Sequence, residues 1–183
     1  MRLVRLTTVD AFVAFDLDDC ETNAGGTRFA PDVTEHEVKL LARAMTYKYA
    51  ALGLRMGGAK GAVRGEAAER ESLMRRYCDE IRPLSETMRF LTGPDLGTFE
   101  TDFATLRPTG NAFSAMTTAM DGIPFEDIVT GFGVVAAAET ALGSLAGTTF
   151  AIEGFGKVGG GVAREAVRRG ARVTAISTIE GLV

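Results

Sequence analysis

The sequence predicts an α/β fold in two domains, and three observations support this prediction. Short segments of strand type alternate with longer stretches in which apolar residues recur at helical spacing. The chain has 183 residues, enough for one well-formed core and part of a second. Residues 107–123 are rich in Gly, Thr, Ser, Asn and Met and have weak periodicity, as expected between domains. We therefore predict a mixed-sheet domain over residues 1–123 and a second α/β domain over residues 124–183.

The composition excludes several classes of function. With 46% hydrophobic residues, 24% charged residues and a net charge of -4, the chain is of the ordinary globular type and has no general attraction for nucleic acids or anionic membranes. No segment is long enough to span a bilayer, and the N-terminus lacks the apolar core of a signal peptide. We expect a cytoplasmic protein with neither a nucleic-acid nor a membrane partner.

The cysteines and the histidine argue against metal chemistry. Cys20 and Cys78 are far apart and match no metal-binding or redox spacing, so we expect two reduced thiols. His36 is the only histidine, which excludes mechanisms that need a histidine base and most zinc sites. We therefore expect no bound metal.

The N-terminal segment is predicted to start a sheet. Residues 3–17 alternate loosely between apolar and polar side chains, which favours two strands with a turn near Asp10. Gly25 and Gly26 then predict a tight turn into a further strand.

A helix is predicted next, with clear start and stop signals. Thr34 and Glu37 have the spacing of a capping box, so the helix is expected to begin at about Glu35 and to end at Gly53. Lys48 falls beside the buried face near the end of this helix. Two interpretations of Lys48 stay open: a ligand-binding cation, or a surface lysine whose stem packs while its amine reaches water.

The segment after this helix combines a lysine with three glycines. Lys60 is predicted to lie in a loop with Gly57, Gly58 and Gly61, where bare backbone permits close approach to a small anionic ligand. A plain turn is the alternative. A phosphate-binding loop of the NTPase type is excluded, because Ala59 precedes the lysine and a glycine replaces the Ser or Thr that must follow it.

Three further elements complete the first domain. Residues 62–63 begin a short strand, and residues 66–81 form an amphipathic helix that is expected to stop at Pro83. Residues 88–92 form a strand that leads directly to Asp95. An aspartate at a strand end is either a turn former or a catalytic carboxylate.

The second domain is predicted to be the start of a dinucleotide-binding fold. Its expected elements are a helix over 130–142, a strand over 148–153, a helix over 162–169 and a strand over 172–177. The GxGxxG motif formed by Gly154, Gly156 and Gly159 lies between the first of these strands and the helix that follows it, which is the context that supports the Rossmann assignment. Thr178 stands where an acidic residue would hold the ribose, so NAD, NADP and a decayed site all stay open.

Four motifs, in order, carry a resemblance to a known family: MTYKYAALGLRMGGAKG, GPDLGT, VTGFGVV and EGFGKVGGGVA. Together they resemble the glutamate, leucine, phenylalanine and valine dehydrogenases, with the leucine, phenylalanine or valine type the closest. The resemblance implies a substrate-binding and oligomerisation domain, a cleft and a Rossmann domain. It also implies a homo-oligomer that deaminates an amino acid oxidatively to a 2-oxo acid and passes hydride to NAD or NADP.

The resemblance also implies roles for individual residues. Lys48 matches the lysine that holds the substrate carboxylate, Lys60 the lysine that activates water, and Asp95 the carboxylate that relays protons. Gly25 and Gly26 match the substrate-binding glycine pair. Cofactor-binding positions are implied for Thr130, near the nicotinamide, and for the loop Gly154, Phe155, Gly156, Lys157, Val158 and Gly159.

Physical chemistry is consistent with a lysine base under particular conditions. A free lysine amine has a pKa of about 10.4 and is too protonated at neutral pH to act as a base. Burial in a closing cleft and the positive charge of Lys48 would favour loss of the Lys60 proton, whereas Asp95 would oppose it and receive the proton.

Two departures from the family pattern affect the prediction. Members that act on glutamate carry a lysine where this chain has Ala24, so we expect an apolar amino-acid substrate. The chain also stops at Val183, before the rest of a Rossmann sheet, so we expect it to be inactive by itself. The alternative function is a non-catalytic regulatory or scaffolding subunit that keeps the oligomerisation domain.

Overall fold

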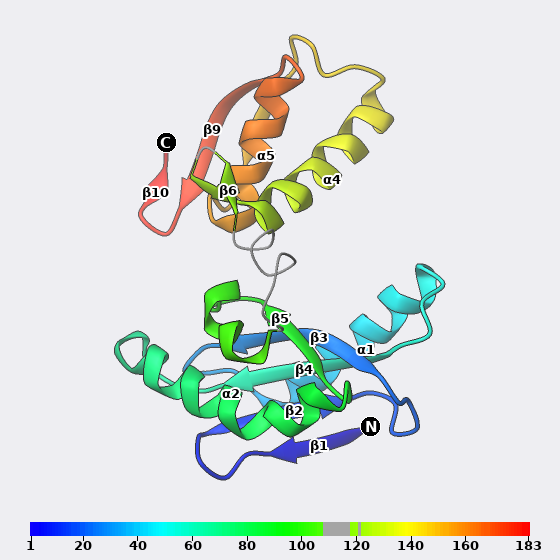
Figure 1. Ribbon diagram of the computed structural model, residues 1–183. Coiled ribbons are helices and arrows are strands. Elements are labelled where there is room, and N and C mark those ends of the chain that lie inside the picture. Colours follow the sequence, from blue (N-terminus) through cyan, green and yellow to red (C-terminus); the bar gives the residue numbers. More distant parts are fainter. Residues whose placement is uncertain (108–117, 121) are drawn as a thin grey trace. The chain divides into compact units, whose positions relative to one another are not determined.

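The computed structural model describes residues 1–107, 118–120 and 122–183, which form two compact units, Met1–Pro108 and Thr109–Val183 (Figure 1). Both units mix helices and strands, so the predicted α/β class is confirmed. The domain boundary predicted after Ile123 falls within the second unit and stays a prediction. Most of residues 107–123, which the sequence analysis places between the domains, lie outside the described residues.

The first unit is built on a five-stranded mixed sheet of order β1-β2-β4-β3-β5. Its strands are β1 (Arg2–Arg5), β2 (Ala11–Phe15), β3 (Asn23–Phe29), β4 (Gly57–Val63) and β5 (Leu91–Pro94). β2 is antiparallel to β1 and β4, whereas β3 is parallel to β4 and β5. The predicted strand pair with a turn near Asp10 is therefore confirmed.

Helices cover both faces of this sheet (Figure 1). They are α1 (Glu35–Ala51) and α2 (Arg70–Glu86), with the short helices η1 (Ala67–Glu69) and η2 (Glu100–Leu106) on either side of α2 in the chain. Phe12 and Ala14 of β2 pack with α1, whereas Val13 and Phe15 pack in the cluster that contains Tyr77 of α2. Because β2 is buried on both faces, the sheet forms the centre of the unit.

The predicted start of α1 is confirmed. The Thr34 hydroxyl accepts a hydrogen bond from the Glu37 backbone N–H at 3.2 Å, as an N-cap requires. The Glu37 carboxylate, however, is ion-paired with Arg28 of β3. The predicted stop is also confirmed, since the helix ends at Ala51 and Gly53 follows with a φ of 70°.

Two glycine pairs that the sequence predicted in a turn and a loop lie inside strands. Gly25 and Gly26 belong to β3, and Gly57 and Gly58 belong to β4 together with Lys60. A Cβ atom at Gly58 would lie 2.0 Å from the Ala42 carbonyl oxygen of α1. These predictions were wrong because the glycines serve the close packing of backbone segments, which has no signature in the local sequence.

Pro83 does not stop α2, contrary to the prediction. The helix continues to Glu86, and Met88, with a φ of 57°, follows it in the left-handed region. A proline inside a helix removes one hydrogen bond, but Leu84 still packs against the core in the last turn. Tertiary packing therefore outweighs the local signal. The following strand begins at Leu91, three residues later than predicted.

The second unit contains the predicted strand, helix and strand. Its elements are β6 (Ala119–Met120), β7 (Ile123–Pro124), α4 (Phe125–Leu142), β8 (Thr149–Ile152), α5 (Lys157–Arg168), β9 (Arg172–Thr178) and β10 (Gly181–Leu182). β8 and β9 are parallel and are joined by α5, and β10 returns antiparallel to β9. α4 and α5 each begin five residues before the predicted position.

The early start of α5 has a packing reason. Its first turns are rich in glycine, which the sequence analysis treated as loop. Gly161 lies against α4, where a Cβ atom would be 2.2 Å from the Asp127 carbonyl oxygen, and Val162 and Ala166 pack with Val135 of α4, so burial against α4 stabilises these turns. Within the described residues, none of the helices has both the length and the apolar character needed to cross a membrane.

Candidate active site

Lys60 occupies the middle of β4 and is largely buried. Its side chain is 8% exposed. Side chains two positions apart on a strand share a face, and Ala62 of the same strand packs with Val38 and Ala42 of α1. Lys60 therefore lies on the face of the sheet that α1 covers.

The structure brings Lys60 and Asp95 together, although 35 positions separate them in the sequence. The Lys60 Nζ atom lies 2.9 Å from the Asp95 Oδ2 atom, directly after the end of β5. The Asp95 backbone N–H donates to the Thr98 hydroxyl at 2.9 Å, and that hydroxyl donates to the Thr27 carbonyl oxygen at 2.8 Å. These bonds fix the turn that presents the carboxylate to the lysine.

A second cation, which sequence reasoning missed as a member of the site, contacts the same carboxylate oxygen. The Arg28 Nε atom donates to Asp95 Oδ2 at 3.1 Å, and the other end of the guanidinium pairs with Glu37. Burial raises the pKa of Asp95, but the hydrogen bonds and charges of Lys60 and Arg28 outweigh burial and lower it overall. The sequence did carry a signal, since Arg28 is a charged residue two positions after the glycine pair, within a predicted strand.

The predicted glycine pair borders this ion pair. A Cβ atom at Gly26 would lie 3.0 Å from the Asp95 Cβ atom and 2.6 Å from the Pro94 carbonyl oxygen. A Cβ atom at Gly25 would lie 1.7 Å from the Ala59 carbonyl oxygen, next to Lys60. The glycine backbone of β3 therefore packs against the residues that directly precede Lys60 and Asp95 in the chain.

Lys48 lies apart from these contacts, on α1. Its side chain is exposed, and within the described part of the chain no hydrogen bond or ion pair is formed by its amine. Lys48 is one turn beyond Met45, whose Cγ atom would be 3.4 Å from a Cβ atom at Gly25. Lys48 therefore lies one helical turn beyond the residue of α1 that packs near the glycine pair, and its side chain is exposed.

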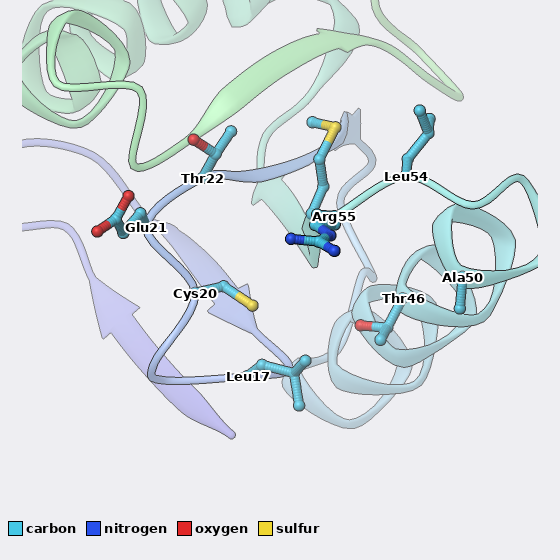
Figure 2. Close-up of a pocket in the computed structure, with 9 residues that line it drawn as sticks. Leu17, Cys20, Glu21, Thr22, Thr46, Ala50, Leu54 and Arg55 are labelled. Carbon is cyan, nitrogen blue, oxygen red and sulfur yellow. The ribbon is translucent and has the colours of Figure 1, made fainter.

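A pocket of about 440 Å³ lies elsewhere in the first unit (Figure 2). It is lined by Leu17, Cys20, Glu21, Thr22, Thr46, Ala50, Leu54, Arg55 and Met56. Figure 2 shows Arg55 between the loop that carries Cys20 and the helix that carries Thr46. None of the three predicted chemical groups, Lys48, Lys60 and Asp95, lines this pocket.

In the second unit, the glycine motif forms the turn between β8 and α5. Gly154 has a φ of 84°, Gly156 is the N-cap of α5, and a Cβ atom at Gly159 would lie 2.3 Å from the Gly154 carbonyl oxygen. The Gly154 N–H donates to the Ser177 hydroxyl at 2.8 Å, and the Phe155 N–H donates to the Ser177 carbonyl oxygen at 2.7 Å. Ser177 of β9, which sequence reasoning did not assign to the site, thus holds the turn.

This turn fits a pyrophosphate. The first backbone N–H groups of α5 have no acceptor within the helix, and the helix dipole favours an anion there. A Cβ atom at Gly156 would meet no atom within 4 Å, so the backbone is open to close approach. Lys157 begins the helix, and the side chains of Phe155 and Val158 are each exposed. The residues present therefore suit the phosphates of a dinucleotide.

Thr130, the remaining predicted cofactor residue, and Thr178, which stands where an acidic residue would hold the ribose, both lie outside the turn. Thr130 is exposed on α4, and its hydroxyl donates to the Glu126 carbonyl oxygen at 2.8 Å. Thr178 is exposed at the end of β9, where its hydroxyl accepts from the Glu180 N–H at 3.1 Å in the turn to β10. Within the described residues, neither hydroxyl contacts the glycine motif.

One buried acid near the turn was also missed. Asp127, in the first turn of α4, is 6% exposed. Burial raises its pKa, while the positive charge of Lys157 partly opposes that shift.

Across residues 1–107, 118–120 and 122–183, no cluster of three or more His, Cys, Asp or Glu side chains could hold a metal ion.

Comparison with known proteins identifies matching families for both halves of the chain. Residues 5–111 match the family described as "Glu/Leu/Phe/Val dehydrogenase, dimerisation domain". Residues 122–183 match the family described as "Glutamate/Leucine/Phenylalanine/Valine dehydrogenase".

Three similar proteins span much more sequence than this chain. The NADP(+)-dependent glutamate dehydrogenase of Pyrobaculum calidifontis is 36% identical to this chain in a match that covers 87% of this chain and 42% of that protein. The glutamate dehydrogenase of Aeropyrum pernix is 32% identical to this chain in a match that covers 86% of this chain and 42% of that protein. The crystal structure of the hetero-hexameric glutamate dehydrogenase of Thermus thermophilus in a Leu-bound form has a TM-score of 0.75 and 29% identity, over 100% of this chain and 51% of that one.

Proposed function

Because this chain belongs to the glutamate, leucine, phenylalanine and valine dehydrogenase family, we propose that it carries the catalytic lysine and aspartate of an amino-acid dehydrogenase. The reaction is the oxidative deamination of an amino acid to a 2-oxo acid with NAD or NADP. The observation that carries this proposal is the buried contact of 2.9 Å between Lys60 and Asp95. The chain spans 42% of the length of the relatives from Pyrobaculum and Aeropyrum, so the activity of the whole enzyme is part of the proposal.

Lys60 and Asp95 divide the proton chemistry between them. An amine that has lost its proton can take one from a water molecule that attacks the substrate carbon, and general acid or base catalysis contributes roughly 10² to 10⁴ in rate. Their separation of 2.9 Å allows direct proton transfer between the amine and the carboxylate. In this proposal, Asp95 relays the proton that Lys60 must lose before it can act.

Substrate binding is assigned to the glycine pair and to Lys48. Gly25 and Gly26 are assigned because their backbone packs against Ala59 and Pro94, which directly precede Lys60 and Asp95 in the chain. Lys48 supplies an exposed cation on the adjacent helix. We assign it to the substrate carboxylate, which is common to all amino acids.

We assign an apolar amino acid as the substrate. Ala24 precedes the glycine pair and is buried, so it offers no charge to a second substrate carboxylate. Arg28 is already paired with Asp95 and Glu37, and an unpaired buried carboxylate costs several kcal/mol. The named relatives are glutamate dehydrogenases, so this assignment separates the chain from them in specificity.

The cofactor is assigned to the second unit. The turn of Gly154, Phe155, Gly156, Lys157, Val158 and Gly159 would hold the pyrophosphate of NAD or NADP, and Thr130 is assigned to the nicotinamide amide. The bound nicotinamide supplies the hydride acceptor. We further propose a cytoplasmic homo-oligomer that assembles through the first unit, in line with the description of the family that matches it.

A mutation of Lys60 tests the proposal in the protein expressed from its complete gene. Oxidation of leucine, valine, phenylalanine and glutamate is measured with NAD and with NADP. Lys60→Ala is expected to lower turnover about 10²- to 10⁴-fold without loss of folding, because it removes a positioned base. Lys39→Ala is the matched control, since Lys39 lies on the surface of α1 near Glu35. Near-normal turnover of the Lys60 variant would exclude Lys60 from the mechanism.

A non-catalytic subunit is the second candidate function. The related Thermus protein is described as hetero-hexameric, which shows that this family includes assemblies of unlike subunits. A subunit of this kind would oxidise no amino acid by itself but would bind a catalytic relative from the same cell. Co-purification of such a relative, together with unchanged assembly activity in the Lys60→Ala variant, would favour this function over catalysis.

A further inference from the structure

Four charged side chains in the first unit form a continuous chain of contacts. Lys60 and Arg28 both contact the Oδ2 atom of Asp95, at 2.9 and 3.1 Å. The opposite end of the Arg28 guanidinium pairs with Glu37 in the first turn of α1. The order is therefore Lys60, Asp95, Arg28 and Glu37, with alternating sign along its length.

Burial makes these contacts electrostatically significant. The exposed fractions are 8% for the Lys60 side chain, 19% for Arg28 and 23% for Asp95. In such surroundings, charges interact more strongly than they do in water. Lys60 and Arg28 share one carboxylate oxygen, so each cation weakens the attraction between Asp95 and the other cation. The two cations also repel each other.

The other charged groups on the surrounding elements are largely committed elsewhere. Asp16, next to β2, is ion-paired with Arg43 of α1 at 3.0 Å. Glu100 of η2 is ion-paired with Arg107 at 2.6 Å. Lys48 of α1 is exposed to solvent. Arg28 is therefore the cation best placed to change the charge that Lys60 experiences from Asp95.

We propose that Arg28 is a positioning residue, held by its ion pair with Glu37. Its positive charge partly neutralises the Asp95 carboxylate that stabilises protonated Lys60, and so makes the Lys60 amine easier to deprotonate. The proposal rests on the function assigned above, because easier proton release matters when Lys60 is a base. It also gives Glu37 a role beyond the helix start: its carboxylate anchors the guanidinium while its backbone N–H bonds to Thr34.

The proposal is tested by nuclear magnetic resonance on the full chain labelled with ¹³C-lysine. The chain contains four lysines, Lys39, Lys48, Lys60 and Lys157, so each ¹³Cε signal can be assigned by single substitution. The pH midpoint of each signal reports proton release directly and needs no turnover. A failure of this proposal is therefore distinguishable from a failure of the proposed enzyme activity.

Three variants give different expected results. Arg28→Gln should raise the Lys60 midpoint by about one pH unit, because a charge within a few ångströms typically has an effect of that size. Arg28→Lys should restore most of the difference. Glu37→Gln should move the midpoint in the opposite direction, since the charge of Arg28 then acts on Asp95 alone. A merely structural role of Arg28 would not produce shifts of opposite sign.

Controls and contrary outcomes are clear. Arg75→Gln should leave the Lys60 midpoint unchanged, because Arg75 pairs with Glu71 on the exposed face of α2. An unchanged midpoint in folded Arg28→Gln would overturn the proposal. If Arg28→Gln does not fold, Glu37→Gln decides, and an unmoved or raised midpoint in that variant would overturn it.

Discussion

At the residue scale, neighbouring side chains limit what the candidate site can bind. Arg28 is committed to Asp95 and Glu37, so a substrate carboxylate could recruit it only by breaking existing ion pairs. Ala24 lies immediately before the glycine pair on β3 and carries no charge. Under the proposed function, we therefore expect specificity for the substrate side chain to depend on small, uncharged residues beside these charged groups.

A lysine at position 24 should redirect specificity toward an acidic substrate. For Ala24→Lys, we expect the ratio of kcat/KM for glutamate to kcat/KM for leucine to rise about tenfold or more. The reason is that a hydrogen bond to a charged group contributes about 1.5 to 3 kcal/mol. Steady-state kinetics with both amino acids, on the enzyme expressed from its complete gene, measure the ratio.

Ala24→Met is the matched control for this substitution, because it adds a long side chain without a charge. A similar change of the ratio in both variants would mean that side-chain bulk, and not charge, sets specificity. An unchanged ratio in Ala24→Lys would mean that another residue recognises the substrate side chain, for example Arg55 in the pocket of Figure 2.

At the element scale, polar side chains fasten turns to the helices and strands that pack beside them. The turn between β1 and β2 is held by Glu80 of α2, which accepts hydrogen bonds from the backbone N–H groups and the hydroxyls of Thr7 and Thr8. The turn between β8 and α5 is held by Ser177 of β9. In both cases the fastening residue lies far away in the sequence.

Acid should weaken the hydrogen bonds between Glu80 and the turn that joins β1 and β2. Burial tends to raise the pKa of Glu80, but the hydrogen bonds from Thr8 and Thr7 outweigh it and lower the pKa to about 2. A lowered pKa in the folded state means that stability is present at pH values above the ordinary range of a glutamate and is lost as the pH falls toward 2. Urea unfolding at several pH values should show this loss between about pH 5 and pH 2.

Glu80→Gln should lower the free energy of unfolding at pH 7 by about 1 to 2 kcal/mol, because it weakens charge-assisted hydrogen bonds near the surface. The variant should also lose less stability than the wild type below pH 5. Asp79→Asn is the neighbouring control, with an exposed carboxylate paired to Arg82. Parallel pH dependence of the wild type and the Glu80 variant would contradict the assignment.

Ser177→Ala should make the turn between β8 and α5 less rigid. The variant removes the acceptor for the Gly154 N–H but keeps the backbone bond to Phe155. The dissociation constant for NAD or NADP, measured by calorimetry, should rise about three- to tenfold, since a net hydrogen bond contributes roughly 0.5 to 1.5 kcal/mol. Ser144→Ala is the control in the same unit, because its hydroxyl caps a separate surface turn. Equal affinities in the two variants would argue against Ser177 as a support of the cofactor turn.

At the scale of the whole molecule, each unit has a hydrophobic core of its own. The first unit packs α1 and α2 on opposite faces of one sheet, and the second packs α4 and α5 with β8 and β9. The ion pair of Lys60 and Asp95 belongs to the first unit, and the glycine turn belongs to the second. The proposed reaction needs both, so substrate chemistry and cofactor binding are assigned to separately folded parts.

Local signals in the sequence were sufficient where neighbouring residues decide the structure. Thr34 caps α1, and Gly53 follows its end, because capping involves residues within a few positions of the helix terminus. The GxGxxG motif was found for the same reason, since strand, turn and helix are consecutive. Lys60 and Asp95 were predicted as catalytic residues from the motifs that contain them, and their roles stay a proposal.

Contacts between distant segments decided the rest, and no local pattern records them. β3 and β4 contain glycines because Ala42 and Ala59 come too close for a side chain at Gly58 and Gly25. α2 continues past Pro83 because Leu84 packs on the core. Arg28 meets Asp95 only after β5 has paired with β3. The sequence by itself determined the α/β class and the family, and it indicated Lys60 and Asp95 as candidate catalytic residues. Only the tertiary structure decided which charges share one oxygen atom, because burial and proximity exist only in the folded chain.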